Sequence, residues 1–115
     1  MTYNEVKTML DSIGVEYAYY QFSEDTAVPP PFICFYYSGD NDLLADDTNY
    51  QKIRHLNVEL YTDAKDFTLE NTIETTLNQN GLVYRKLESY IDTEKLMMVT
   101  WECDMVVTDI ITEGE

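Results

Sequence analysis

The sequence predicts an α+β fold in which two helices cover one face of an antiparallel sheet of about five strands. Two segments place apolar residues at helical spacing, and five others show the alternating or continuous apolar pattern of strands. Their order is α-β-β-β-α-β-β, which lacks the regular strand-helix-strand alternation of a parallel nucleotide-binding fold.

The first helix is predicted over residues 2–13. Thr2 and Glu5 have the spacing of a capping box, in which each side chain accepts a hydrogen bond from the other residue's backbone N–H. Gly14 ends the pattern. The apolar stripe that should face the sheet consists of Val6, Met9, Leu10 and Ile13.

Two strands and two loops are predicted next. Residues 15–22 (VEYAYYQF) and 32–37 (FICFYY) favour strands because aromatic and branched residues dominate them. Between them, the three prolines Pro29–Pro31 require a loop. Residues 38–49 form a long polar stretch, which predicts a second loop, and a loop of this length usually has a function or is disordered.

The second half of the chain predicts a long strand, a helix and a closing pair of strands. In the strand at 49–63, Leu56, Val58 and Leu60 alternate with polar residues. Asp66 can cap a helix over 67–80, with Leu69, Ile73 and Leu77 on its inner side and Gly81 at its end. In the last strand, six apolar residues share one face: Met97, Val99, Trp101, Cys103, Met105 and Val107.

Length and charge narrow the class of protein. A chain of 115 residues suits one core, so we expect a single domain over 1–115 with a frayed acidic tail at 109–115. The net charge of −15 argues against binding to nucleic acid phosphates or to anionic membrane surfaces. Cys34 and Cys103 lie in apolar runs, which predicts buried free thiols in a reducing cytoplasm.

No constellation of residues predicts an enzyme, a cofactor or a metal centre. His55 is the only histidine and falls in the middle of a predicted strand, as an ordinary surface residue would. The acidic run from Asp40 to Asp47 begins like a calcium loop, but Leu44 stands where a ligand is needed and Ala45 where a glycine must turn the chain. A solvated acidic loop is the better interpretation, and a weak divalent site there stays open.

The predicted sheet has more apolar surface than two helices can cover. In FICFYY, Phe32, Cys34 and Tyr36 point to one face and Ile33, Phe35 and Tyr37 to the other. One of the two faces must therefore meet water or a partner, and exposed apolar patches tend to mark association sites. This pattern favours self-assembly, while half-exposed tyrosines with their hydroxyls in water are the alternative.

The element order, with the segments PPPFICFYY, NVELYTDAKDF, NQNG and YIDTEKLMMVTWE, resembles a family of small prophage proteins of Gram-positive bacteria, the siphophage tail-completion and tail-terminator proteins. The resemblance covers nearly the whole chain. It implies a virion structural protein without catalytic residues or cofactors, which forms a ring, expected to be hexameric, at the head-tail junction. It also implies assembly in the bacterial host cytoplasm, followed by incorporation into the virion next to tail-tube and connector proteins.

Subunit contacts are predicted on the two loops and on three aromatic residues. The predicted interface residues are Tyr20, Pro29, Pro30, Pro31, Phe35, Tyr37, Asp40, Asp42, Leu43, Leu44, Asp46 and Asp47. The alternative function is that of an acidic DNA mimic, which would inhibit a host DNA-binding enzyme. Mimicry requires carboxylates in rows at phosphate-like spacing, whereas the acidic residues here cluster in predicted loops, helices and the tail.

Overall fold

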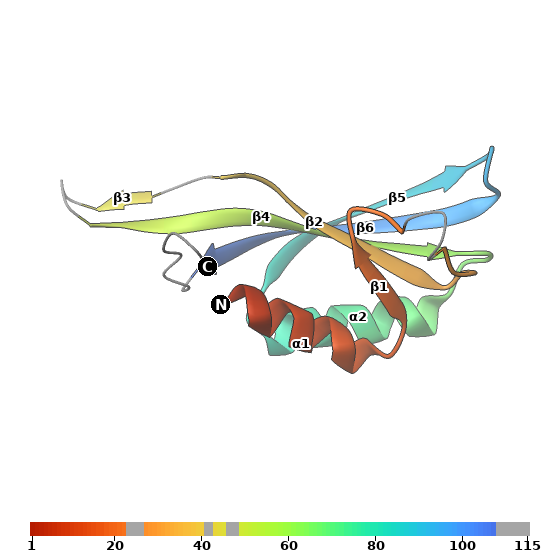
Figure 1. The fold of residues 1–115 in the computed structure, drawn as a ribbon, viewed down its shortest axis with the longest axis horizontal. Helices are drawn as coiled ribbons and strands as arrows, with labels where there is room; N and C mark the ends of the chain where they lie inside the picture. Colours follow the sequence, from red (N-terminus) through yellow and green to blue (C-terminus); the bar gives the residue numbers. More distant parts are fainter. Residues whose placement is uncertain (23–26, 41–42, 46–48, 108–115) are drawn as a thin grey trace.

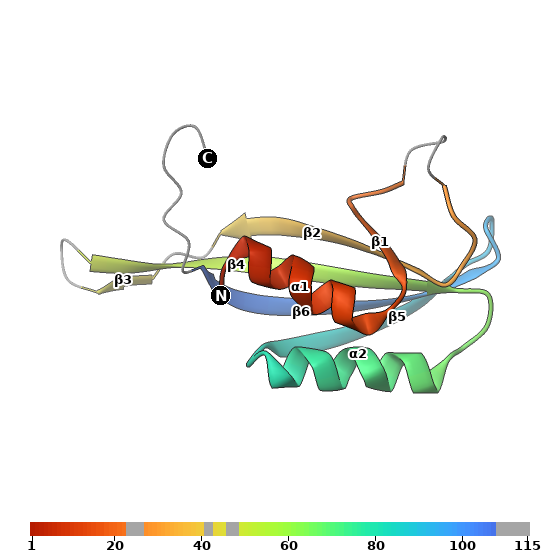
Figure 2. The ribbon, with the colours of Figure 1, turned by 60° about the horizontal axis from the view of Figure 1, so that its bottom comes forward.

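A computed structural model describes residues 1–22, 27–40, 43–45 and 49–107. The strands form one sheet in the order β1-β2-β4-β6-β5, with β3 paired to β4, and both helices lie on the same face of it (Figures 1 and 2). The predicted fold class and element order are confirmed, and the predicted tail at 109–115 lies outside the described residues. The elements are α1 (Tyr3–Ile13), β1 (Glu16–Tyr19), β2 (Phe32–Asp40), β3 (Leu43–Ala45), β4 (Asn49–Thr62), α2 (Phe67–Gln79), β5 (Val83–Ile91) and β6 (Leu96–Val107).

Both helices begin at the predicted caps. The Glu5 N–H donates to Thr2 Oγ1 at 3.0 Å, and the Thr2 N–H donates to Glu5 Oε1 at 2.8 Å, which completes the capping box of α1. Gly14 follows α1 in the left-handed conformation, with φ of 90°, which glycine adopts without a steric penalty. At α2, Asp66 Oδ1 accepts from the Leu69 N–H at 3.0 Å.

The core lies between the helices and the inner face of the sheet. Its centre is Trp101, which has no solvent-exposed surface. The stripes predicted for α1 and for the inner faces of β4 and β6 are confirmed. The buried apolar residues include Val6, Met9, Leu10 and Ile13 of α1, Leu56, Val58 and Leu60 of β4, and Val99, Trp101, Cys103 and Met105 of β6.

A network of charged side chains joins α2 to β5. Glu70 is almost fully buried, and its carboxylate accepts from Lys65 and Lys86 at 2.8–2.9 Å. Lys86 also contacts Glu74 at 2.7 Å, and Lys65 pairs with Glu88 of β5. Because a buried carboxylate is costly unless it is paired, these contacts fix α2 over β5 and β6.

One strand pair runs in the direction opposite to the prediction. β1 and β2 are parallel, with Glu16 opposite Phe32 and Tyr19 opposite Phe35, while the other strand pairs are antiparallel. β1 ends at Tyr19, earlier than predicted, because Tyr20 turns the chain with a φ of 68°. The connection between the two strands is long enough to return the chain to the end at which β1 began, so a parallel pair can form.

A two-stranded ribbon extends from the other end of the sheet. Leu43–Ala45 forms β3 inside the stretch that was predicted as a loop, and it pairs with residues 49–51 of β4. Among the described residues, the last pair between β4 and β6 is Lys52 opposite Val107, whereas β3 pairs with residues that precede Lys52. Figure 1 shows this ribbon, residues 43–45 and 49–51, projecting past the two helices.

Candidate functional site: the open face of the sheet

The face of the sheet opposite the helices carries aromatic, apolar and charged side chains together. The strand registers place Phe32, Tyr61 and Met98 side by side across β2, β4 and β6. The next rows toward the ribbon hold Cys34, Glu59 and Thr100, then Tyr36, Asn57 and Glu102, then Ser38, His55 and Asp104. We call this surface the open face.

The chain that follows β1 folds back over part of the open face. The Tyr20 ring stacks on the Tyr36 ring, with centroids 5.2 Å apart and planes at 11°. The backbone N–H of Tyr20 donates to the Phe35 carbonyl at 2.9 Å. Phe22 meets Phe32 edge to face at 5.5 Å, and Phe32 stacks on Tyr61 at 4.9 Å. The aromatic surface predicted to be uncovered is therefore partly covered by the protein itself, and Tyr20 remains 59% exposed.

Glu59 holds two of these tyrosines in place. Its carboxylate accepts from the Tyr36 hydroxyl at 3.2 Å and from the Tyr61 hydroxyl at 2.8 Å. Burial, followed by the nearby Glu59 charge and its hydrogen bonds, raises the pKa of both phenols above the ordinary value of 10.0. Both tyrosines stay neutral at physiological pH and fix the orientation of the carboxylate between them.

Both cysteines are buried and free, as predicted. Burial raises the pKa of the Cys34 thiol to about 11, with Glu59 adding to the shift, and raises that of Cys103 to about 12. Because the thiolate is the reactive form, neither side chain is activated as a nucleophile at neutral pH.

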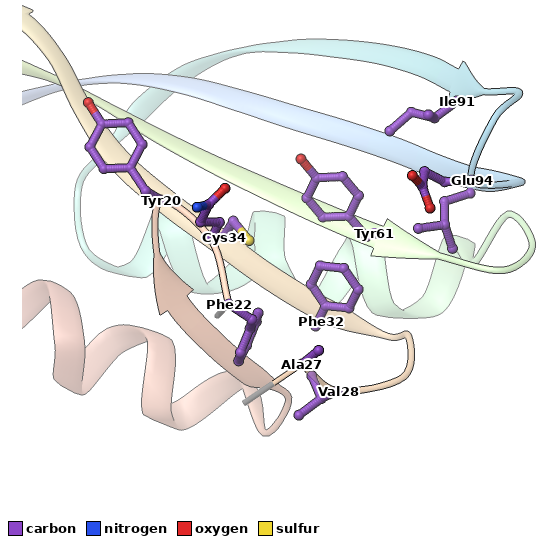
Figure 3. A pocket seen from close by; sticks show the side chains of 11 residues that line it. Tyr20, Phe22, Ala27, Val28, Phe32, Cys34, Tyr61, Ile91 and Glu94 are labelled. Carbon is purple, nitrogen blue, oxygen red and sulfur yellow. The ribbon is translucent and has the colours of Figure 1, made fainter. Parts of the chain in front are cut away.

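An apolar cavity of about 370 Å³ opens at the end of this aromatic surface. Figure 3 shows that its walls come from three parts of the chain: the segment after β1, the strands β2 and β4, and the β5–β6 turn. A cavity of roughly 150 Å³ lined by apolar side chains already binds benzene, so this one is large enough to hold apolar groups of side-chain size. The lining residues are Tyr20, Gln21, Phe22, Ala27, Val28, Phe32, Cys34, Tyr61, Ile91, Glu94 and Leu96.

Two of the three predicted interface aromatics lie elsewhere. Phe35 is 4% exposed in the core, and Tyr37 points to the same inner face, where its ring meets Tyr3 at 5.1 Å. The interface assignment for Phe35 was wrong, because the alternation along β2 turns odd-numbered residues toward the helices. Tyr20 lines the open-face cavity, and its role in a subunit contact stays a prediction.

Parts of the predicted contact loops form strands in the structure. Pro29–Pro31 lead into β2, and Pro30 and Pro31 line a second hollow beside the β4–α2 connection. Asp40 ends β2, and Leu43 and Leu44 belong to the ribbon. Asp42, Asp46 and Asp47 lie outside the described residues, as does most of the acidic loop in which a weak divalent site was considered.

The far wall of the cavity was not predicted from the sequence. Ile91, Glu94 and Leu96 are distant from Tyr20 along the chain, and only the sheet order brings them near it. Glu59 and Tyr61 alternate with the apolar residues Val58 and Leu60 in the sequence, and their place on the open face follows from that alternation. That these two residues lie beside β2 could not be predicted from the sequence and is seen only in the structure.

Most carboxylates on the strands have partners. Asp104 accepts from His55 Nδ1 at 2.8 Å, and Glu102 lies 3.7 Å from Arg85 Nε. With Glu59 held by two phenols, the described part of the open face lacks the row of bare carboxylates that DNA mimicry requires. Among residues 1–22, 27–40, 43–45 and 49–107, no group of three potential metal ligands gathers, and no helix has the length and apolar character to span a membrane.

No model of a protein family matches this chain, and no curated protein matches it in sequence. Among solved structures, the fold is similar to that of a chain in the virion of a native gene transfer agent (GTA) particle. The TM-score is 0.54 at 10% sequence identity, and the alignment covers 89% of this chain and 87% of that chain. At this identity the similarity shows a shared fold over nearly the full length of both chains.

Proposed function

We propose that this chain is a structural subunit of a virion, in particular a tail-completion or tail-terminator subunit that forms a ring of six copies at the head-tail junction. The observation that carries the proposal is the fold similarity to a chain of the GTA virion over 89% of the present chain. The partners proposed are other copies of the chain, tail-tube subunits and connector proteins. No catalytic role, cofactor or metal is assigned.

The subunit has two different surfaces of the kind that ring contacts need. A closed ring requires each copy to offer one surface to the copy before it and another to the copy after it. The open-face cavity includes Tyr61, near the end of β4, whereas the ribbon contains residues 49–51 at the start of the same strand. The two surfaces therefore lie at opposite ends of the longest strand.

The ribbon of one copy and the cavity of the next form the proposed contact. An isolated two-stranded hairpin is only marginally stable in water, so the ribbon gains most if it docks on a neighbour. The ribbon has two leucines in its sequence, at positions 43 and 44, and the cavity walls are aromatic and aliphatic. Because consecutive strand residues alternate between the two faces, one leucine can enter the cavity, and its burial contributes about 1.5–3 kcal/mol to docking before the cost of association.

Filling the cavity tests this contact. Ala27→Trp places a large ring in the cavity from an exposed position, so the monomer should still fold while ring formation is lost. Thr75→Trp, on the exposed surface of α2, is the matched control and should leave the rings intact. Electron microscopy and sedimentation, with and without tail-tube subunits, would measure the rings. A wild-type protein that stays monomeric in both settings would refute the proposal.

A further inference from the structure

β5 is a long edge strand whose outer side is unpaired. It has nine residues and lies at one end of the strand order, and β6 is its only neighbour among the described strands. In the described part of the chain, no backbone hydrogen bond reaches the outer edge of Val83–Tyr90. Natural proteins usually shorten, charge or cover such an edge because its free N–H and C=O groups accept another strand.

The sequence of β5 is complementary to itself around its central residue. We infer that a second copy of this chain adds to this edge, with the two β5 strands antiparallel about a twofold axis at Leu87. Residues that lie directly opposite each other in such a pair share one face of the sheet and interact. The facing pairs are Lys86 with Glu88, Arg85 with Ser89, Tyr84 with Tyr90 and Val83 with Ile91.

In this register, side chains of opposite charge face each other, and so do aromatic side chains. Lys86 faces the Glu88 of the partner copy, so two oppositely charged pairs flank the axis, and their side chains are 37% and 47% exposed in the single subunit. Tyr90 is 52% exposed and Val83 79%, and both meet side chains of similar character. A slip by one residue on one strand moves the charged pairs out of register and turns each side chain to the other face.

An exposed phenylalanine on α2 supports the same contact. Phe67 is 73% exposed, which is unusual for an aromatic residue of a helix that packs on a sheet. On a helix it shares a side with Glu70 and Glu74, at positions i+3 and i+7, and both of these contact Lys86 of β5. Phe67 therefore points toward the β5 edge.

The helices of the two copies have room in this arrangement. Neighbouring strands lie about 4.8 Å apart, so two α2 helices, each over its own β5–β6 pair, come to lie about 10 Å apart across the axis. That separation is normal for packed helices, and it covers Phe67. The contact uses the same surface on both copies and closes at two, so it stands independently of the proposed ring contact, which uses two different surfaces.

Disulfide trapping tests the axis directly. In an antiparallel pair the Cα atoms of opposed residues are about 4.5–5.5 Å apart, within the range of a disulfide. Leu87→Cys should therefore give a covalent dimer under mild oxidation. Val106→Cys is the matched control, because Leu87 and Val106 are 40% and 42% exposed on the same face but Val106 lies beyond the pairing with β5. The native cysteines are buried and should give no dimer in the wild type.

Substitutions at the axis and on α2 complete the test. Leu87→Asp places two like charges opposite each other and should weaken dimerisation at least about tenfold in sedimentation equilibrium, and Phe67→Ser should weaken it as well. Val106→Asp should leave it unchanged, and circular dichroism checks that each variant folds. Monomeric wild-type protein would overturn the inference. Equal amounts of covalent dimer from Leu87→Cys and Val106→Cys would also overturn it. So would a Leu87→Cys protein that forms rings but no covalent dimer.

Discussion

Glu74 connects three parts of the molecule through one carboxylate. It extends from α2, accepts from Trp101 Nε1 of β6 at 3.2 Å and contacts Lys86 of β5 at 2.7 Å. Its partial burial raises its pKa, but the hydrogen bonds from Lys86 and Trp101 outweigh that effect and hold the pKa below the usual 4.5. The charged form of Glu74 is thus favoured by the fold.

Glu74→Gln should make the protein less sensitive to acid. A carboxylate whose folded pKa is depressed contributes stability that is present above its unfolded pKa of 4.5 and is lost as the pH falls through the folded value. The variant should have a lower free energy of unfolding at pH 7, and the difference from wild type should shrink as the pH falls below 4.5. Urea titrations across this range measure it. Glu94→Gln, at the exposed β5–β6 turn, is the control, and a pH-independent difference for Glu74→Gln would contradict the argument.

At the scale of elements, local patterns predicted the helices well. Caps and apolar stripes depend on residues within a few positions of one another, so Thr2, Glu5 and Gly14 define α1 without knowledge of the rest of the chain. The parallel direction of β1 depends on the path of the connection to β2, which no local pattern encodes. β3 was missed because its three residues gain their structure by pairing with β4.

Thr2→Ala should destabilise the protein through α1 alone. The substitution removes the acceptor for the Glu5 N–H and half of the capping box, at a cost of about 1 kcal/mol. Thr8→Ala is the matched control, since Thr8 lies on the exposed side of α1 and donates only to the Asn4 carbonyl within the helix. Chemical denaturation followed by circular dichroism measures both. Equal effects of the two substitutions would show that the cap does not anchor the helix.

At the scale of the whole molecule, like charge opposes every contact between copies. With a net charge of −15, two subunits repel each other at long range, and salt screens this repulsion over a distance of about 10 Å at 0.1 M. Self-association, whether by ring contacts or by β5, should therefore strengthen as sodium chloride rises from 50 to 500 mM. Sedimentation velocity at fixed protein concentration tests this. Association that weakens with salt would mean that attractive ion pairs dominate the interface.

The candidate site was predictable only where one strand contributes to it. The sequence predicted surplus aromatic surface and a contact role for Tyr20, and both fit the open face. Phe35 was predicted to lie at an interface because the sequence of a continuous apolar strand does not reveal which of its faces the helices cover. The cavity itself depends on a turn between β5 and β6 that lines it together with the segment after β1, and this arrangement arises only from the complete sheet.

The position of Trp101 offers a way to observe folding and assembly separately. It is the only tryptophan, it is fully buried, and it faces the helices, on the side of the sheet opposite the open face. Its fluorescence emission should therefore shift to longer wavelength when the core opens and should keep its wavelength when copies associate. A variant that loses rings or dimers but retains the blue-shifted emission has lost a contact between subunits, and one that loses both has lost its fold.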